Sequence, residues 1–141
     1  MADIAVAFNS LLMGDADVVA LIGDRLFPNA APQNPTEPYV TYGRVDTQHI
    51  GSFQGSGGLA NVLMQFDIWG APYSSVRSVA DRFRLVLQGY KGLAGGVDVR
   101  GIIAGTEEDD WADISQTDGG EKVLHRVTMD FTAWFYEDKP T

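Results

Sequence analysis

The chain has 141 residues, of which 45% are hydrophobic and 21% charged, a balance typical of one globular domain and not of a disordered chain. Its 19 acidic residues outnumber 10 basic ones and give a net charge of −9, which argues against direct binding of nucleic acid because phosphates would be repelled. Cysteine is absent, so disulfides, thiolate nucleophiles and zinc–thiolate sites are excluded.

The first part of the chain predicts two short helices. Apolar residues recur on one face of residues 3–13, as in an amphipathic helix, and Gly14 interrupts the pattern. Asp15 is suited to cap a second helix over residues 16–22, which Gly23 ends. We expect synthesis in a cytoplasm and no membrane segment, because the start is acidic and no long apolar run follows. The apolar face of the first helix consists of Ile4, Phe8, Leu11 and Leu12.

A proline-rich arm over residues 28–38 then leads into an extended β-hairpin. Residues 39–47 are β-branched and aromatic, as strand residues are, and residues 60–68 alternate between apolar and polar side chains. The glycine-rich residues 48–58 between them are interpreted as a flexible loop at the hairpin tip. The apolar face of the second strand consists of Ala60, Val62, Met64, Phe66 and Ile68.

The second half of the chain predicts a long helix and two more strands. Ser74 or Ser75 is placed to cap a helix that continues to about Tyr90. A strand over residues 97–104 follows, then a second flexible, polar loop over residues 105–120. The clearest alternation of the chain marks a last strand over residues 122–136, and the polar tail of residues 137–141 is expected to fray.

Together these elements predict an α+β fold in one domain, residues 1–141. Strands that alternate so clearly have one covered face and one wetter face, as antiparallel sheets do. We therefore expect a curved antiparallel sheet of about four main strands, with the long helix packed on one face. The N-terminal helices and the extended β-hairpin complete this architecture.

The sequence offers little that points to catalysis. His49 falls in the first loop and His125 on the apolar side of the last strand, and neither has a partner at the spacing of a metal site or a catalytic triad. The glycines of residues 55–58 precede a strand and not a helix, unlike a phosphate-binding loop. We therefore predict no catalytic residue, no cofactor and no metal, and a protein that is not an enzyme.

One alternative of a different class rests on the acidic run Glu107, Glu108, Asp109 and Asp110. Carboxylates at this density suit a hard cation, although the spacing does not match an EF-hand and acidic loops are usually just solvated. A cation-binding or small-molecule-binding domain therefore stays open beside the main interpretation.

Exposed apolar side chains point more clearly to a partner surface. Phe53 lies in the glycine-rich loop and Trp111 beside the acidic run, and large aromatic residues in such positions favour protein contacts. The two loops are therefore the candidate assembly interface. Its predicted residues are His49, Phe53, Gln54, Glu107, Glu108, Asp109, Asp110 and Trp111.

Four segments, in this order and spacing, resemble one known family. They are GDRLFP at residues 23–28, PYVTY at 38–42, QFDIW at 65–69 and RVTMDF at 126–131. The resemblance covers nearly the whole chain and is to the tail-terminator (tail-completion) proteins of long-tailed bacteriophages.

The resemblance implies an α+β subunit of the virion, assembled in the host cytoplasm, that forms a six-fold ring with copies of itself at the head-proximal end of the tail tube. Such a ring stops tube growth, contacts the tail tube protein on one side and a neck or head-completion protein on the other, and lets DNA pass its lumen without specific binding. We expect the two loops to make subunit or tube contacts and to order on assembly. A neck or head-completion adaptor is the structural alternative, since it would be an equally small, acidic ring-former.

Overall fold

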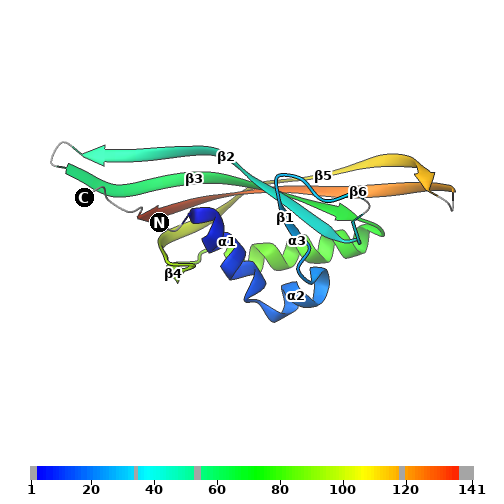
Figure 1. The fold of residues 1–141 in the computed structure, drawn as a ribbon, viewed down its shortest axis with the longest axis horizontal. Helices are drawn as coiled ribbons and strands as arrows, with labels where there is room; N and C mark the ends of the chain where they lie inside the picture. The colour runs from blue at the N-terminus through cyan, green and yellow to red at the C-terminus, as the bar shows by residue number, and fades with distance from the viewer. Residues whose placement is uncertain (1–2, 34, 53–54, 118–119, 137–141) are drawn as a thin grey trace.

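The computed structural model describes residues 3–33, 35–52, 55–117 and 120–136. Six strands form a single sheet in the order β1-β2-β3-β6-β5-β4, and the helices lie together on one of its faces (Figure 1). In chain order the elements are α1 (Ile4–Met13), α2 (Ala16–Ile22), β1 (Leu26–Pro28), β2 (Tyr39–Ser52), β3 (Gly55–Gly70), α3 (Tyr73–Leu87), β4 (Gly92–Ala94), β5 (Val97–Thr117) and β6 (Gly120–Tyr136).

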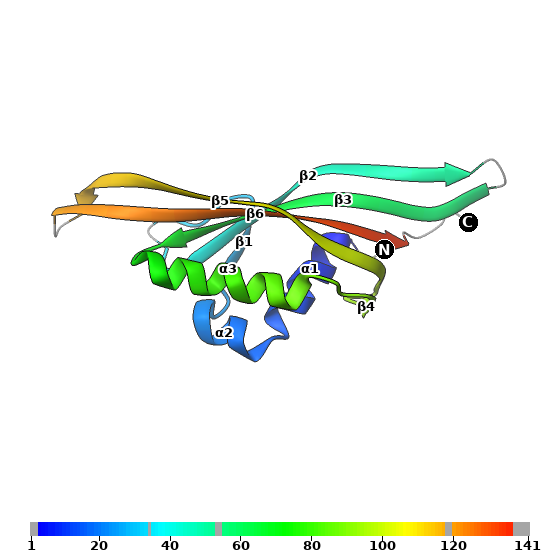
Figure 2. The same cartoon turned by 180° about the vertical axis from the view of Figure 1, so that it is seen from behind.

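The sheet is much longer than the helical layer that covers its centre. The ends of β2 and β3 project in one direction and the ends of β5 and β6 in the other, as both views show (Figures 1 and 2). We call these projections the β2–β3 arm, residues 46–52 with 55–63, and the β5–β6 arm, residues 106–117 with 120–128. Each arm narrows to two strands, because the β3–β6 pairing runs only from Leu59–Tyr136 to Gly70–His125.

The hydrophobic core lies between the helices and the centre of the sheet, around Phe66 of β3. The Phe66 ring meets the rings of Phe8, Tyr42, Phe83 and Phe131 at centroid distances of 5.7 to 5.8 Å. These rings come from α1, β2, α3 and β6, so one side chain ties the helical layer to three strands. The predicted apolar face of β3 is confirmed, because Ala60, Val62, Met64, Phe66 and Ile68 are all buried.

The two N-terminal helices begin and end where the sequence predicts. Asp3 caps α1 by accepting from the Ala5 N–H, and Asp15 caps α2 by accepting from the N–H groups of Asp17 and Val18. Gly23 ends α2 with a φ of 60°, which favours glycine. No helix in the described chain is by itself long and apolar enough to span a membrane; α1 and α2 pass that test only as a pair, bent by 87°.

The predicted α+β class is confirmed, but the expected count of about four strands is wrong. Two three-residue edge strands, β1 and β4, were too short to leave a pattern in the sequence. The sheet is also not wholly antiparallel, since β1 pairs with β2 in parallel. Pro28 ends β1 at the sheet edge, a position that does not require an N–H donor.

The long helix was predicted with the wrong ends. It runs from Tyr73 to Leu87, three residues short of Tyr90, and Gly89 follows with a φ of 80°. Its N-cap is Pro72 with no side-chain cap bond, so Ser74 and Ser75 lie within the first turn. The buried stripe is largely as predicted, with Val76, Val79, Ala80, Phe83 and Leu87 all inaccessible to solvent.

The two segments predicted as loops are mostly strand. Residues 48–52 continue β2, residues 55–58 begin β3, and residues 105–117 continue β5. A two-stranded ribbon is held by backbone hydrogen bonds and buries neither face, so its side chains need not alternate. Residues 53–54, 118–119 and the tail 137–141 lie outside the described residues, so the predicted flexibility and fraying there stay predictions.

Candidate assembly surface

The acidic run lies on the β5–β6 arm, in a strand and not in a solvated loop. Its register against β6 pairs Glu107 with Met129, Glu108 with Thr128, and Asp109 with Val127. Successive strand residues face opposite sides, so the four carboxylates divide between the two faces of the sheet. Glu107 and Asp109 face the helices, whereas Glu108 and Asp110 face away from them.

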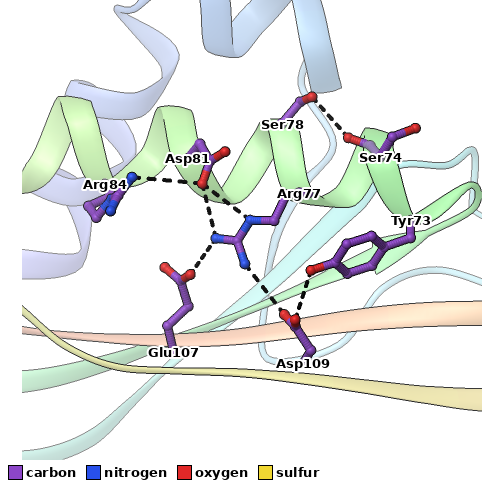
Figure 3. A network of polar contacts seen from close by, with 8 residues as sticks. All are labelled: Tyr73, Ser74, Arg77, Ser78, Asp81, Arg84, Glu107 and Asp109. Carbon is purple, nitrogen blue, oxygen red and sulfur yellow. Dashed lines mark hydrogen bonds and ion pairs between the residues drawn. The ribbon is translucent and has the colours of Figure 1, made fainter.

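On the helix side, the guanidinium of Arg77 on α3 contacts several carboxylates at once (Figure 3). It forms ion pairs with Asp81 at 3.1 Å, with Asp109 at 3.4 Å and, closer still, with Glu107. The Tyr73 hydroxyl donates to the second oxygen of Asp109 at 2.7 Å. These contacts fasten the first turns of α3 to the base of the β5–β6 arm.

The electrostatics of this cluster keep Arg77 charged. Burial alone would lower the pKa of Arg77, but the hydrogen bond to Glu107 and the charges of Glu107 and Asp81 raise the pKa above its ordinary value. The guanidinium therefore supplies the positive charge that faces Glu107 and Asp109. Across the described part of the chain, no group of three or more acidic, histidine or cysteine side chains is arranged to hold a metal ion.

On the helix-free face, a second arginine joins the arm to the sheet. Arg126 of β6 pairs with Asp110 at 2.7 Å and lies over the Trp69 ring at 5.2 Å. The Trp69 ring stacks on Tyr39 at 6.3 Å and donates from its indole N–H to the Thr41 hydroxyl. Trp69 and Tyr39 thus pack along the surface of the sheet itself.

The structure separates the predicted interface residues into two groups. Trp111 is 62% exposed on the β5–β6 arm, and Glu108 of the same strand is also exposed. His49 is exposed on the β2–β3 arm, opposite Ala60, and therefore at the other end of the molecule (Figure 1). Phe53 and Gln54 lie outside the described residues.

Sequence reasoning missed the arginines that organise the acidic run. The spacing of residues along the helix suggests only one partner for Arg77, which is Asp81 at position i+4. The sequence also offered no sign of the contact between the C-terminus of α3 and β5, in which the Ala104 N–H donates to the Gln88 side chain. One feature of the sequence could have indicated these arginines, namely the dense negative charge of residues 107–110. Such a run of carboxylates requires positive side chains nearby when it packs against a helix. The ring of His125 packs against the ring of Tyr73 in a T-shaped arrangement, with a centroid distance of 5.5 Å.

Comparison with known proteins gives one family and a shared fold. A family model described as tail completion protein gp17 matches residues 6–136. A chain in the solved virion of a native gene transfer agent (GTA) particle superposes with a TM-score of 0.67 at 19% identity, covering 96% of this chain and 95% of that chain. A second solved chain gives a TM-score of 0.55 at 16% identity and covers 98% and 96%. Comparison with curated proteins gives no match.

Proposed function

The chain belongs to the tail completion protein gp17 family, a family of phage structural proteins, and from this premise we propose that it closes the head-proximal end of a tail tube. In this proposal it assembles as a ring, six-fold as in the tail-terminator proteins that its sequence resembles. The ring ends tube elongation and forms part of the joint to the head. The single observation that carries the proposal is the family match over residues 6–136.

The shape of the molecule supports a role in assembly. Two arms project beyond the packed centre in opposite directions, which gives one small subunit contact surfaces far apart from each other (Figure 1). Trp111 lies exposed on one of these arms, and a large exposed aromatic side chain is typical of a protein interface. The proposed mechanism is therefore steric, with one side of the ring matching the last tube ring and the other side unable to accept another tube subunit.

The charge of the helix-free face fits a conduit for DNA. Asp67, Asp110 and Asp130 lie on this face, where Arg126 is the partner of Asp110 and Thr128 donates to Asp67. A surface rich in carboxylates repels phosphate and gives DNA no sites at which to bind. We propose that DNA passes the ring without specific contacts.

The proposal is tested by deleting the gene from the phage or prophage that carries it and measuring tail lengths in the lysate by electron microscopy. Headless tails of excessive and variable length are the expected result. Restoring the gene on a plasmid is the control and should return tails to normal length. Particles of normal form in the deletion lysate would contradict a structural role.

The same experiment separates the second structural candidate, a neck or head-completion adaptor. Loss of an adaptor leaves tube length under normal control, so tails of normal length would accumulate beside filled heads. The proposed partners differ accordingly: the tail tube protein for a terminator, and the head-side rings for an adaptor.

A further inference from the structure

We propose that neighbouring copies of this chain join by β-sheet pairing, the outer edge of the β5–β6 arm of one copy pairing antiparallel with the outer edge of the β2–β3 arm of the next. This inference rests on the proposed ring and names the surfaces that would form it. It commits to a second copy of the chain as the partner.

Each arm has one long strand, β2 or β5, whose outer edge within the arm forms no backbone pairing with another strand of the described chain. β1 covers β2 only at Val40–Tyr42 in the register, and β4 covers β5 only at Val97–Val99. Beyond these short strands, residues 43–52 of β2 and 105–117 of β5 are outer strands. An exposed strand edge, with its unpaired N–H and C=O groups, is a template for pairing with another chain.

The backbone groups of alternate residues face these edges. On β5 the Ile102 carbonyl accepts from the Gly89 N–H, and the Ala104 N–H donates to the Gln88 side chain. The backbone N–H and C=O groups of these two residues therefore point to the outer edge of the sheet, away from β6. When the register is followed past the bulge after Ala104, the next residues whose backbone N–H and C=O groups point to the outer edge are Glu107, Asp109 and Trp111.

On β2, two backbone hydrogen bonds to the neighbouring segment show which residues have backbone groups that point to the outer edge. The Val40 N–H donates to the Arg25 carbonyl, and the Tyr42 carbonyl accepts from the Asn29 N–H. Past the bulge between Arg44 and Asp46, the residues of the β2–β3 arm whose backbone N–H and C=O groups point to the outer edge are Thr47 and His49.

The charges favour pairing between unlike edges. Two β5 edges placed side by side would bring the four carboxylates of residues 107–110 against each other, which is destabilising. The β2 edge is close to neutral over residues 43–52, with Arg44, Asp46 and His49 as its titratable groups. The contact is therefore heterologous, and a heterologous contact forms a ring when its rotation closes.

The strand directions suit this contact. β2 and β5 lie toward opposite edges of the sheet, and each runs toward the tip of its own arm, in opposite directions (Figures 1 and 2). A second copy displaced along the strands without turning over therefore presents its β2 antiparallel to β5 of the first. The helices then stay on one side of a continuous sheet, and the acidic helix-free faces stay on the other.

The test uses the absence of cysteine in the natural chain. Glu108→Cys and Gln48→Cys place single thiols on exposed positions of the two edges, both on the helix-free face, opposite Thr128 and Asn61 respectively. Particles that carry the double variant are purified, treated with a short bis-maleimide and examined by immunoblot. A ladder of dimer and larger species at the expense of the monomer is expected, and each single variant should stay monomeric.

The controls separate this inference from the proposed function. Leu85→Cys with Gln48→Cys pairs one edge with an exposed helix position, 68% accessible, and should give no ladder. If the double variant is present in particles but gives no ladder, or if a single variant cross-links to itself, the edge pairing is overturned while the ring proposal stands. Absence of the chain from particles would overturn the proposed function and the inference together.

A second variant tests the backbone bonds directly. Thr47→Pro removes an N–H donor at the outer edge, where proline is tolerated within the subunit itself. We expect a folded chain, with a melting temperature close to that of Thr47→Ala, that is lost from the cross-linked ladder when built into the double-cysteine variant. An unchanged ladder in a folded Thr47→Pro chain would contradict pairing along this edge.

Discussion

At the scale of single residues, Arg77 joins helix α3 to the β5–β6 arm. It is the shared partner of Asp81 on its own helix and of Glu107 and Asp109 on β5 (Figure 3). Exposed ion pairs contribute little one at a time, but a guanidinium shared among several carboxylates holds them in one geometry. Arg84, about two helical turns further on, contacts only Asp81 among the described ion pairs, at 3.8 Å, and is half exposed.

We therefore predict that Arg77→Met lowers the free energy of unfolding by about 1 kcal/mol, because two carboxylates on β5 lose their counter-charge. Arg84→Met is the matched control and should change stability by much less. Chemical denaturation followed by circular dichroism measures both variants. Equal losses in the two variants would mean that the arm contacts contribute nothing beyond those within the helix.

A second residue-scale prediction concerns acid. The hydrogen bond from Arg82 is the largest cause that lowers the pKa of Asp15 from its ordinary 3.8, and the N–H groups that it caps act in the same direction. A carboxyl group with a lowered folded pKa stabilises the protein above its unfolded pKa, and this contribution is lost as the pH falls through the folded value.

Asp15→Asn keeps a capping side chain but removes the charge that faces Arg82. Its melting temperature should therefore lie below that of the natural chain at neutral pH, and the difference should shrink as the pH falls below 3.8 and through the lowered pKa of Asp15. Thermal melts across this pH range test the prediction. A difference that stays constant with pH would assign the effect to the cap and not to the charge.

At the scale of elements, the β5–β6 arm begins at a bulge built on Gly105. A Cβ at this position would lie 2.1 Å from Asp130 Oδ1. The same carboxylate accepts from the Thr106 N–H at 2.8 Å and from the Thr106 hydroxyl at 2.7 Å. A side chain at this position, where β5 turns out of the body and into the arm, would therefore force the Asp130 carboxylate to move.

We predict that Gly105→Ala displaces the Asp130 side chain and lowers the free energy of unfolding by roughly 1 to 3 kcal/mol, since two hydrogen bonds are broken. Gly101→Ala is the matched control on the same strand, because a Cβ there meets nothing within 4 Å. Denaturation midpoints of the two variants give the comparison. A Gly105→Ala chain as stable as Gly101→Ala would show that Asp130 can move without loss.

The elements that the sequence predicted well are those that bury one face. Alternation from Ala60 to Ile68 and from Val127 to Phe135 follows from packing against the helices, so the pattern identifies β3 and β6 directly. Residues 55–58 are all glycine except Ser56 and have no apolar side chains that could alternate, and Glu107 to Asp110 are polar on both faces because arginine side chains pair with them. Neither segment therefore carries such a pattern, and both were predicted as loops. The acidic run was recognised as a feature of the surface, but its ties to Arg77 and Arg126 depend on tertiary contacts that no local spacing reveals.

At the scale of the whole molecule, the fold separates what stabilises the subunit from what is free to contact others. Among the described residues, no member of the core cluster lies between Ala104 and Val127. The core is concentrated under the helices, and the outer part of the β5–β6 arm stands apart from it (Figure 2). We therefore expect the outer part of the arm to contribute little to the stability of the subunit.

This separation leads to a last prediction, that the arm can be shortened without unfolding the protein. Replacing residues 113–123 with Asn-Gly joins Ala112 to Leu124, which already face each other in the ladder, through a two-residue turn suited to a hairpin. The shortened chain should melt within a few degrees of the natural chain, because the core is untouched, but it should fail to restore tail length in the deletion lysate. Gly101→Ala, which keeps the whole arm, should restore it. A shortened chain that restores normal tails would show that the outer arm has no part in assembly, whereas one that unfolds would place stabilising contacts beyond the core described here.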